Sequence, residues 1–130
     1  MATQERPLSP HLQVYKPQLT SAMSILHRGT GVALALGSLL LAAWLIAAAG
    51  DAGTFDRAAT ALASLPGKVA LFALCAALVY HFFNGLRHLF WDAGHGYALP
   101  AAYASGYAVL LLSVVVTAGL WYLGLRGGGA

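Results

Sequence analysis

The sequence predicts an all-α integral membrane protein with three transmembrane helices. Of its 130 residues, 59% are hydrophobic and only 8% are charged, a composition far from that of a soluble domain. Three apolar runs are each long enough, at about 20 residues, to cross a bilayer as a helix. The formal charge of +3 is spread over tails, loops and span ends without a basic cluster, which argues against nucleic-acid binding.

The chain divides into a polar N-terminal tail, residues 1–23, and a membrane-anchor domain, residues 24–130. Three prolines favour extended or irregular backbone in the tail: Pro7, Pro10 and Pro17. The first apolar run begins late, near Gly29, and is long enough to span a bilayer, so we expect it to stay uncleaved rather than to serve as a signal peptide.

The first span is expected near residues 29–49. A helix beginning near Thr20 or Ser21, either of which has a capping hydroxyl, should lead into it. Gly50, Asp51 and Gly53 should end it.

The second span is expected near residues 69–91. Before it, residues 54–65 mix charged and apolar side chains in a way typical of a short amphipathic helix on the membrane surface. Pro66 and Gly67 predict a turn, and Lys68 then opens the span with a side chain long enough to reach the head groups.

The third span is expected near residues 103–125, after a short loop over 94–102, with Trp121, Tyr122 and Arg126 as an interfacial anchor. Three spans place the two termini on opposite sides of the membrane. The basic residues divide four to three between the sides, with Arg6, Lys16, Arg28 and Arg87 on the N-terminal side and Arg57, Lys68 and Arg126 on the other. This difference leans toward a cytoplasmic N-terminus.

Three helices enclose a large cofactor poorly, so we expect this chain to pack against another membrane subunit. The third span contains small residues that permit close helix contact, namely Ser105, Gly106, Ser113, Thr117 and Gly119. The same residues could serve packing within the chain, and the sequence leaves both interpretations open.

The candidate cofactor ligand is His81, which follows an uncharged apolar run where a polar side chain is costly. On a helix, His81, Gly85, His88 and Asp92 share one face. A glycine one turn after a histidine leaves room for a flat ligand such as a haem edge. The alternative is a neutral histidine hydrogen-bonded to a neighbouring helix, and His88 with Asp92 could equally form a local pair.

A second candidate site lies at the start of the first span, where Ser24, His27 and Arg28 share one helical face. A hydroxyl, an imidazole and a guanidinium can hydrogen-bond a quinone carbonyl and stabilise the negative charge that develops on reduction, and arginine can also bind haem propionates. The alternative is that the two basic residues are anchors solvated by lipid head groups.

Other kinds of chemistry find no support in the sequence. There is no nucleophile triad, phosphate loop or paired Cys-x-x-Cys motif. The single cysteine, Cys75, lies in an apolar run and is interpreted as a packing residue. His11 and His95 fall in the tail and in a loop, and neither is assigned a role.

Two longer motifs, in this order along the chain, match one family. The first is Arg6-Pro7-Leu8, then Leu12, Leu19 and Ser24-x-x-His27-Arg28-x-Thr30. The second is His81-x-x-x-Gly85-Leu86-Arg87-His88-Leu89-x-Trp91-Asp92-x-Gly94. They resemble the two signatures of the cytochrome b subunit of succinate dehydrogenase, and the resemblance extends over the whole chain, including its three-span layout.

The resemblance implies a membrane anchor of succinate:ubiquinone oxidoreductase, respiratory complex II, which joins the tricarboxylic acid cycle to the respiratory chain. In that family a flavoprotein subunit oxidises succinate, and an iron-sulfur subunit passes electrons to ubiquinone bound at the anchor. This chain would then be part of the enzyme without touching succinate. The implied location is the bacterial inner (cytoplasmic) membrane with a cytoplasmic N-terminus, or the mitochondrial inner membrane in a eukaryote.

The resemblance also implies roles for single residues. His81 matches an axial ligand of haem b, and the other ligand comes from a histidine of a second anchor subunit that completes the helix bundle. Ser24 and Arg28 match quinone-site residues. His27 matches a position near the haem propionates. From the residues themselves, Arg28 is a further candidate for a propionate contact, and Arg87 and His88 could reach propionates or head groups.

Three alternatives remain from the sequence. A quinol:fumarate reductase anchor would work in the opposite direction with a low-potential quinone such as menaquinone. A haem-free structural scaffold would use His81 only for packing. A self-contained dihaem cytochrome b is disfavoured because it needs four histidine ligands, and only His27, His81 and His88 lie in or near the spans.

Overall fold

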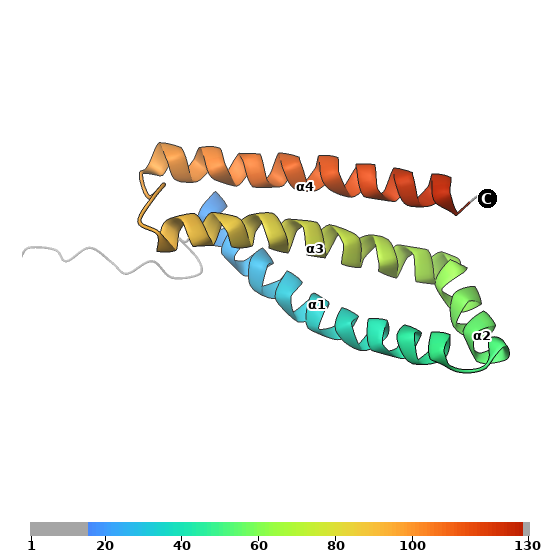
Figure 1. The fold of residues 1–130 in the computed structure, drawn as a ribbon. Coiled ribbons are helices and arrows are strands. Elements are labelled where there is room, and N and C mark those ends of the chain that lie inside the picture. Colours follow the sequence, from blue (N-terminus) through green and yellow to red (C-terminus); the bar gives the residue numbers. More distant parts are fainter. Residues whose placement is uncertain (1–15, 129–130) are drawn as a thin grey trace, which may run out of the picture.

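The computed structural model describes residues 16–128, which form four helices and no strand (Figure 1). Helix α1 covers Leu19–Ala49, α2 Ala52–Ala63, α3 Leu65–Asp92 and α4 Leu99–Gly127. Helices α1, α3 and α4 are each long and apolar enough to cross a membrane. The predicted all-α class with three membrane spans is confirmed.

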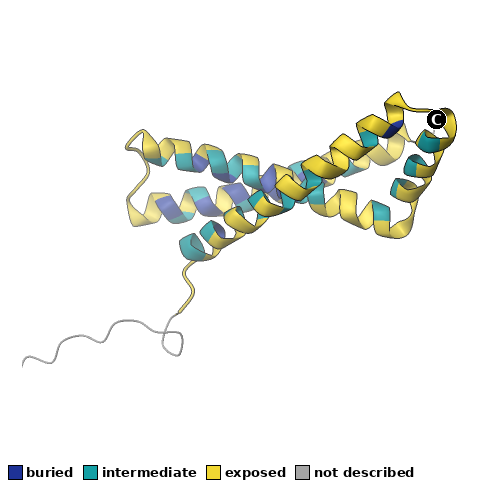
Figure 2. Ribbon diagram, turned by 90° about the horizontal axis from the view of Figure 1, so that it is seen from below, coloured by how far each residue is buried: buried dark blue, intermediate teal, exposed yellow. Residues whose placement is uncertain are grey.

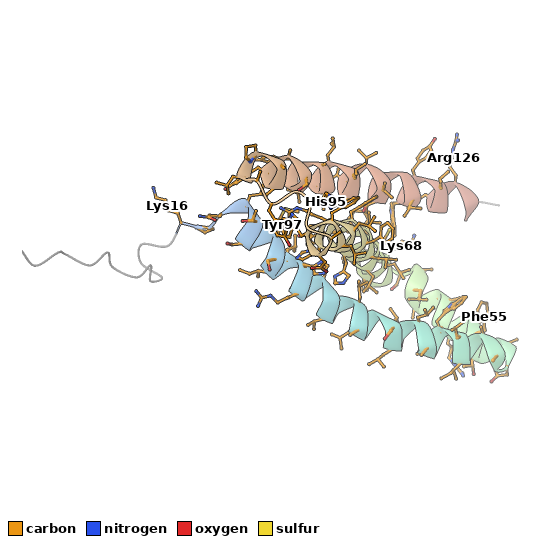
Figure 3. All side chains as sticks on the ribbon, turned by 60° about the vertical axis from the view of Figure 1, so that its left-hand side comes forward. Lys16, Phe55, Lys68, His95, Tyr97 and Arg126 are labelled. Atoms are coloured by element: carbon orange, nitrogen blue, oxygen red, sulfur yellow. The ribbon has the colours of Figure 1, made fainter. Side chains whose placement is uncertain are left out.

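Helix α3 lies between α1 and α4 and packs against both (Figure 1). Helix α1 crosses α3 near its own beginning and then diverges from α4 toward α2. The beginning of α1 and the end of α4 lie at opposite ends of the bundle. Lys16, His95 and Tyr97 lie at the end where α1 begins, while Phe55 and Arg126 lie at the other end (Figure 3).

The core of the bundle is small, and most residues on the outer faces of the long helices are exposed (Figure 2). Met23, Tyr80 and Val109, one residue from each long helix, are buried together at its centre. The Tyr80 hydroxyl donates a hydrogen bond of 2.7 Å to the carbonyl oxygen of Met23, which ties α3 to α1. The large exposed apolar faces suit a chain surrounded by lipid and by other membrane subunits.

Among the small residues of α4, Gly106 packs against another helix of this chain and Gly119 does not. A Cβ added at Gly106 would lie 3.1 Å from Met23 Sδ and 3.3 Å from Leu19 Cδ2, so glycine lets α1 approach α4 here. Gly119 has nothing within 4 Å of an added Cβ. Ser113 and Thr117 are buried.

The expected cap of α1 is wrong. The N-cap is Gln18, without a side-chain cap hydrogen bond, and both Thr20 and Ser21 lie inside the first turn. The Ala22 N–H already donates to the Gln18 carbonyl at 2.9 Å, so the helix begins as soon as the chain has passed Pro17.

The predicted helix before the second span is confirmed, with a start at Ala52 instead of residue 54. Asp51 caps it: the carboxylate accepts hydrogen bonds from the backbone N–H and the hydroxyl of Thr54, at 2.9 and 2.7 Å. These hydrogen bonds lower the pKa of Asp51 below its ordinary value.

The predicted turn at Pro66 and Gly67 is also wrong, because both residues lie in the first turn of α3. Ser64 is the N-cap and accepts from the Gly67 N–H at 3.3 Å. Proline suits this turn because its missing N–H has no helical partner there. A Cβ at Gly67 would overlap the Ala61 carbonyl oxygen, so glycine allows α2 and α3 to meet almost without a loop.

The loop before α4 is shorter than expected, since α4 begins at Leu99 with Pro100 in its first turn. Gly94 and Gly96 adopt positive φ angles of 83° and 80°, which only glycine adopts readily. The Trp91 indole N–H donates to the Gly96 carbonyl at 3.1 Å and closes the loop against the end of α3.

Candidate functional site

Three histidines form a row between α1 and α3. The rings of His27 and His81 stack with centroids 3.9 Å apart and planes 7° from parallel. On the other side of His27, the ring of His88 lies 5.0 Å away at 24°. His27 therefore inserts from α1 between two histidines that α3 presents two turns apart.

The hydrogen bonds of His81 define its tautomer. Its Nδ1 lies 3.1 Å from the His27 carbonyl oxygen and 3.1 Å from the Thr30 hydroxyl. Because the Thr30 hydroxyl itself donates to that carbonyl at 2.9 Å, Nδ1 carries the proton and donates to the carbonyl. The lone pair of Nε2 is then free to bind a metal.

The glycine that makes room for His81 is Gly31 on α1. A Cβ at this position would lie 3.2 Å from His81 Cε1. Gly85, which the sequence suggested for this role, faces His27 instead, with an added Cβ 3.9 Å from its Cε1. Sequence reasoning missed Gly31 because the spacing of residues within one helix does not show which residues of another helix lie beside them.

His88 does not use the local partner that was considered for it. Its Nδ1 lies 2.7 Å from the Asn84 carbonyl one turn earlier, and its ring meets the edge of Trp91 with centroids 5.3 Å apart. Nδ1 of His27 is buried and has no hydrogen-bond partner in the described part of the chain. Because a buried polar nitrogen is normally hydrogen-bonded, its partner lies outside the residues that the structure describes.

A polar pocket of about 420 Å³ lies beside this row, at the end of the bundle where α1 begins. It brings together Ser24, Arg28 and His88, which sequence reasoning singled out. Its remaining lining residues are Thr20, Ser21, Ile25, Arg87 and Trp91. His27 does not line it.

Arg87 also lines this pocket, although residue spacing did not place it with Ser24 and Arg28. It is only 5% exposed. Its Nε donates to Ser105 Oγ at 2.9 Å and its Nη2 to the Ala102 carbonyl at 2.8 Å, so it clamps α3 to α4. The guanidinium carbon lies 4.1 Å from the centre of the Trp91 ring. An arginine inside an apolar helix was the signal that could have identified it.

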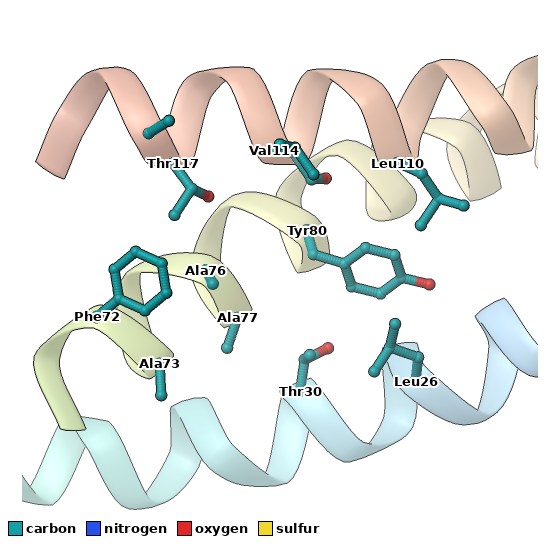
Figure 4. Close-up of a pocket in the computed structure, with 12 residues that line it drawn as sticks. Leu26, Thr30, Phe72, Ala73, Ala76, Ala77, Tyr80, Leu110, Val114 and Thr117 are labelled. Atoms are coloured by element: carbon teal, nitrogen blue, oxygen red, sulfur yellow. The ribbon is translucent and has the colours of Figure 1, made fainter. Parts of the chain in front are cut away.

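A larger pocket, of about 490 Å³, lies deeper in the bundle between α1 and α4 and is floored by α3 (Figure 4). Its lining is mostly apolar, with Leu26, Ala77 and Leu110 among its residues. The hydroxyls of Thr30 and Tyr80, which also line it, are used in hydrogen bonds to neighbours. None of the predicted site residues lies in this pocket.

His11 and the first part of the N-terminal motif, Arg6-Pro7-Leu8, lie outside the described residues. His95 lies in the loop before α4, where its backbone N–H donates to the Phe90 carbonyl at 3.0 Å, and it takes no part in the histidine row.

The fold and the site together define a multi-pass, all-α membrane protein with a histidine cluster between two of its spans. Residues 2–120 match the family described as succinate dehydrogenase/fumarate reductase transmembrane subunit, and the chain belongs to this family.

Individual relatives agree with this assignment. The succinate dehydrogenase cytochrome b556 subunit of Rickettsia prowazekii is 42% identical over 117 residues, covering 90% of this chain and 91% of the relative. The subunit of the same name from Rickettsia felis is 43% identical over the same shares. The mitochondrial succinate dehydrogenase cytochrome b560 subunit of Homo sapiens is 43% identical over 88% of this chain and 69% of its own length.

Proposed function

We propose that this protein is the haem b-binding anchor subunit of a succinate:ubiquinone oxidoreductase and carries electrons from the iron-sulfur subunit to quinone. The observation that carries the proposal is the hydrogen bond from His81 Nδ1 to the His27 carbonyl, which leaves the lone pair of Nε2 available to a metal. Membership of the family adds independent support. The flavoprotein subunit, not this chain, would act on succinate.

The residues present fit a haem. His81 Nε2 would hold the iron, and the Nδ1–H hydrogen bond would orient the ring and raise its basicity, as outer hydrogen bonds do for metal-bound histidines. A histidine of a second anchor subunit would supply the other axial ligand. A haem with two histidine ligands has no open position for oxygen and serves as a one-electron carrier.

The propionates of the haem would lie toward the polar end of the row. His27, whose Nδ1 has no partner among residues 16–128, is the first candidate for a propionate contact, and Arg28 and His88 are the others. His27 and Arg28 lie near the beginning of α1 and His88 near the end of α3, so the charged edge of the haem would face the membrane boundary rather than the lipid core.

The polar pocket is the proposed quinone site. Ser24 offers a hydroxyl to a quinone carbonyl, and Arg28 offers a fixed positive charge that stabilises the negative charge arising as electrons arrive. With a cytoplasmic N-terminus, this pocket would lie beneath the iron-sulfur subunit. Ubiquinone is the proposed substrate, and menaquinone would be the substrate of an anchor working in the fumarate-reducing direction.

The test compares quinone reduction with dye reduction in the purified complex. Ser24→Ala and Arg28→Leu should each lower succinate-to-quinone turnover, by about tenfold to a hundredfold for the arginine, because a preorganised charge is lost. Succinate oxidation with a soluble dye, which does not need the anchor, should persist. Ser38→Ala is the matched control, since Ser38 lies on the same helix outside the pocket and its hydroxyl donates to the Ala35 carbonyl. Unchanged quinone turnover in both pocket variants would remove the proposed site.

A further inference from the structure

Arg87 is a charged side chain in an unusual place for a membrane helix. It lies inside α3, a helix of 28 residues with an apolar window long enough to cross the bilayer, and it is 5% exposed. Burying a guanidinium in such a segment is costly, so a buried arginine there marks either a structural clamp or a place where negative charge is to be received.

The clamp accounts for only part of its hydrogen-bonding capacity. A guanidinium carries five N–H donors. Arg87 uses one toward Ser105 Oγ, one toward the Ala102 carbonyl and one, at a long 3.5 Å, toward Asn84 Oδ1. None of these acceptors is a carboxylate, so these contacts give the charge of Arg87 no counter-ion among residues 16–128. Asn84 beside it is fully buried, and its Nδ2 has no partner in the described part of the chain.

Arg87 lines the polar pocket from α3, and Arg28 lines it from α1. Arg87 also lines a second, mostly apolar pocket between α3 and α4. The two cations differ in their surroundings, because Arg28 is exposed while Arg87 is buried. A charge in a low-dielectric environment acts more strongly on a neighbouring group than the same charge in water. The ring of Trp91, 4.1 Å from the guanidinium carbon, fixes the position of this charge.

We propose that Arg87 is a second cationic residue of the quinone pocket, and that its fixed charge makes the pocket bind an anionic quinoid ring more tightly than a neutral ring of the same shape. The proposal rests on the function proposed above. Arg87 then has a chemical role in addition to its structural contacts. Its charge stabilises the bound ring at the stage of reduction when a ring oxygen carries negative charge.

The experiment uses the detergent-purified complex and two competitive inhibitors of quinone reduction. One is an alkylated quinone with an acidic ring hydroxyl that is ionised at neutral pH, and the other is its methyl ether, which is neutral and of similar shape. The ratio of their inhibition constants measures the preference of the pocket for an anion. It is determined for the native complex and for four variants, Arg87→Met, Arg87→Lys, Arg28→Leu and Ser105→Ala.

The expected result is a native ratio that favours the anion and falls by about tenfold or more in Arg87→Met, since a nearby buried charge has been removed. Arg87→Lys should keep most of the preference because it keeps the charge. Ser105→Ala, which removes one clamp contact but no charge, should keep all of it.

Two results would overturn this inference. One is equal binding of the two inhibitors by the native complex. This measurement does not depend on the assembly of any variant. The other is an unchanged ratio in Arg87→Met accompanied by a reduced ratio in Arg28→Leu, which would leave the quinone site in place and make Arg87 a clamp only. The proposed function itself would fail differently, through unchanged quinone turnover in the Ser24 and Arg28 variants.

Discussion

The imidazole rings of His27 and His81 lie face to face, 3.9 Å apart and 7° from parallel, although 54 positions separate the residues in the chain. The same pair is joined by a hydrogen bond from the His81 ring to the His27 backbone. One histidine thus fixes the other twice, through its ring and through its carbonyl. This relationship fixes the position of the proposed ligand.

The two contacts can be separated by changing the side chain of His27. In His27→Leu the carbonyl that accepts from His81 Nδ1 remains, so we expect haem to stay bound, with an affinity lowered by no more than about tenfold. The loss of the stacked ring should broaden or shift the low-spin electron paramagnetic resonance signal, because the His81 ring is freer to rotate. Complete loss of haem in this variant would show that His27 itself is a ligand.

The space beside His81 depends on Gly31. A side chain at this position meets His81 Cε1 already at the Cβ atom, 3.2 Å away, so Gly31→Val should displace the ring and lower the haem content several-fold. Gly29→Val is the control on the same helix, because nothing lies within 4 Å of a Cβ at Gly29. The haem content per purified complex is measured for both variants. Equal haem content in the two variants would contradict the placement of His81.

The hydroxyl of Tyr80 should contribute to stability. Tyr80→Phe removes a buried hydrogen bond to the Met23 carbonyl, which should cost about 1 kcal/mol in the free energy of unfolding. Thermal inactivation of the purified complex should occur at a lower temperature. Tyr122→Phe serves as the comparison, since Tyr122 is 54% exposed, and it should leave the temperature unchanged. A smaller shift for Tyr80→Phe than for Tyr122→Phe would count against the core described above.

The cap at Asp51 predicts a pH dependence of α2. Hydrogen bonds from Thr54 hold the pKa of Asp51 below its ordinary value of 3.8, so the ionised form is favoured in the helix. Its stabilisation is fully present above that ordinary value and is lost as the pH falls through the lowered one. Hydrogen-exchange protection of the first turn of α2 should decline over this range. Asp51→Asn, which does not ionise, should abolish the decline, and a decline that persists in Asp51→Asn would have another cause.

Apolar run length was enough to predict the three spans, because about 20 uncharged residues leave a chain few alternatives in a membrane. The helix ends were harder. Pro66 and Pro100 look like breakers in sequence, yet each stands in the first turn of a helix, where proline is well accommodated. Whether a proline ends one helix or begins the next depends on the backbone before it, which a residue pattern does not state.

The candidate site was predictable within each helix and not between helices. Spacings of three and four placed Ser24 with Arg28, and the pocket does contain both residues. The contacts of His81 with Thr30 and Gly31 depend on how α1 crosses α3, and no spacing encodes that crossing. Arg87 could have been weighted more heavily on physical grounds, because a guanidinium within a membrane helix needs a partner wherever it lies.

The most direct test of the account is a reduced-minus-oxidised optical spectrum, with haem quantified, of the purified complex carrying native His81 or His81→Ala. His95→Ala, a change at a loop histidine outside the row, is the control. The account predicts a low-spin b-type spectrum in the native and control complexes and its loss, or conversion to a high-spin spectrum, in His81→Ala with all subunits still assembled. A native complex without haem, or an unchanged spectrum in His81→Ala, would contradict it and leave His81 as a packing residue of a membrane scaffold.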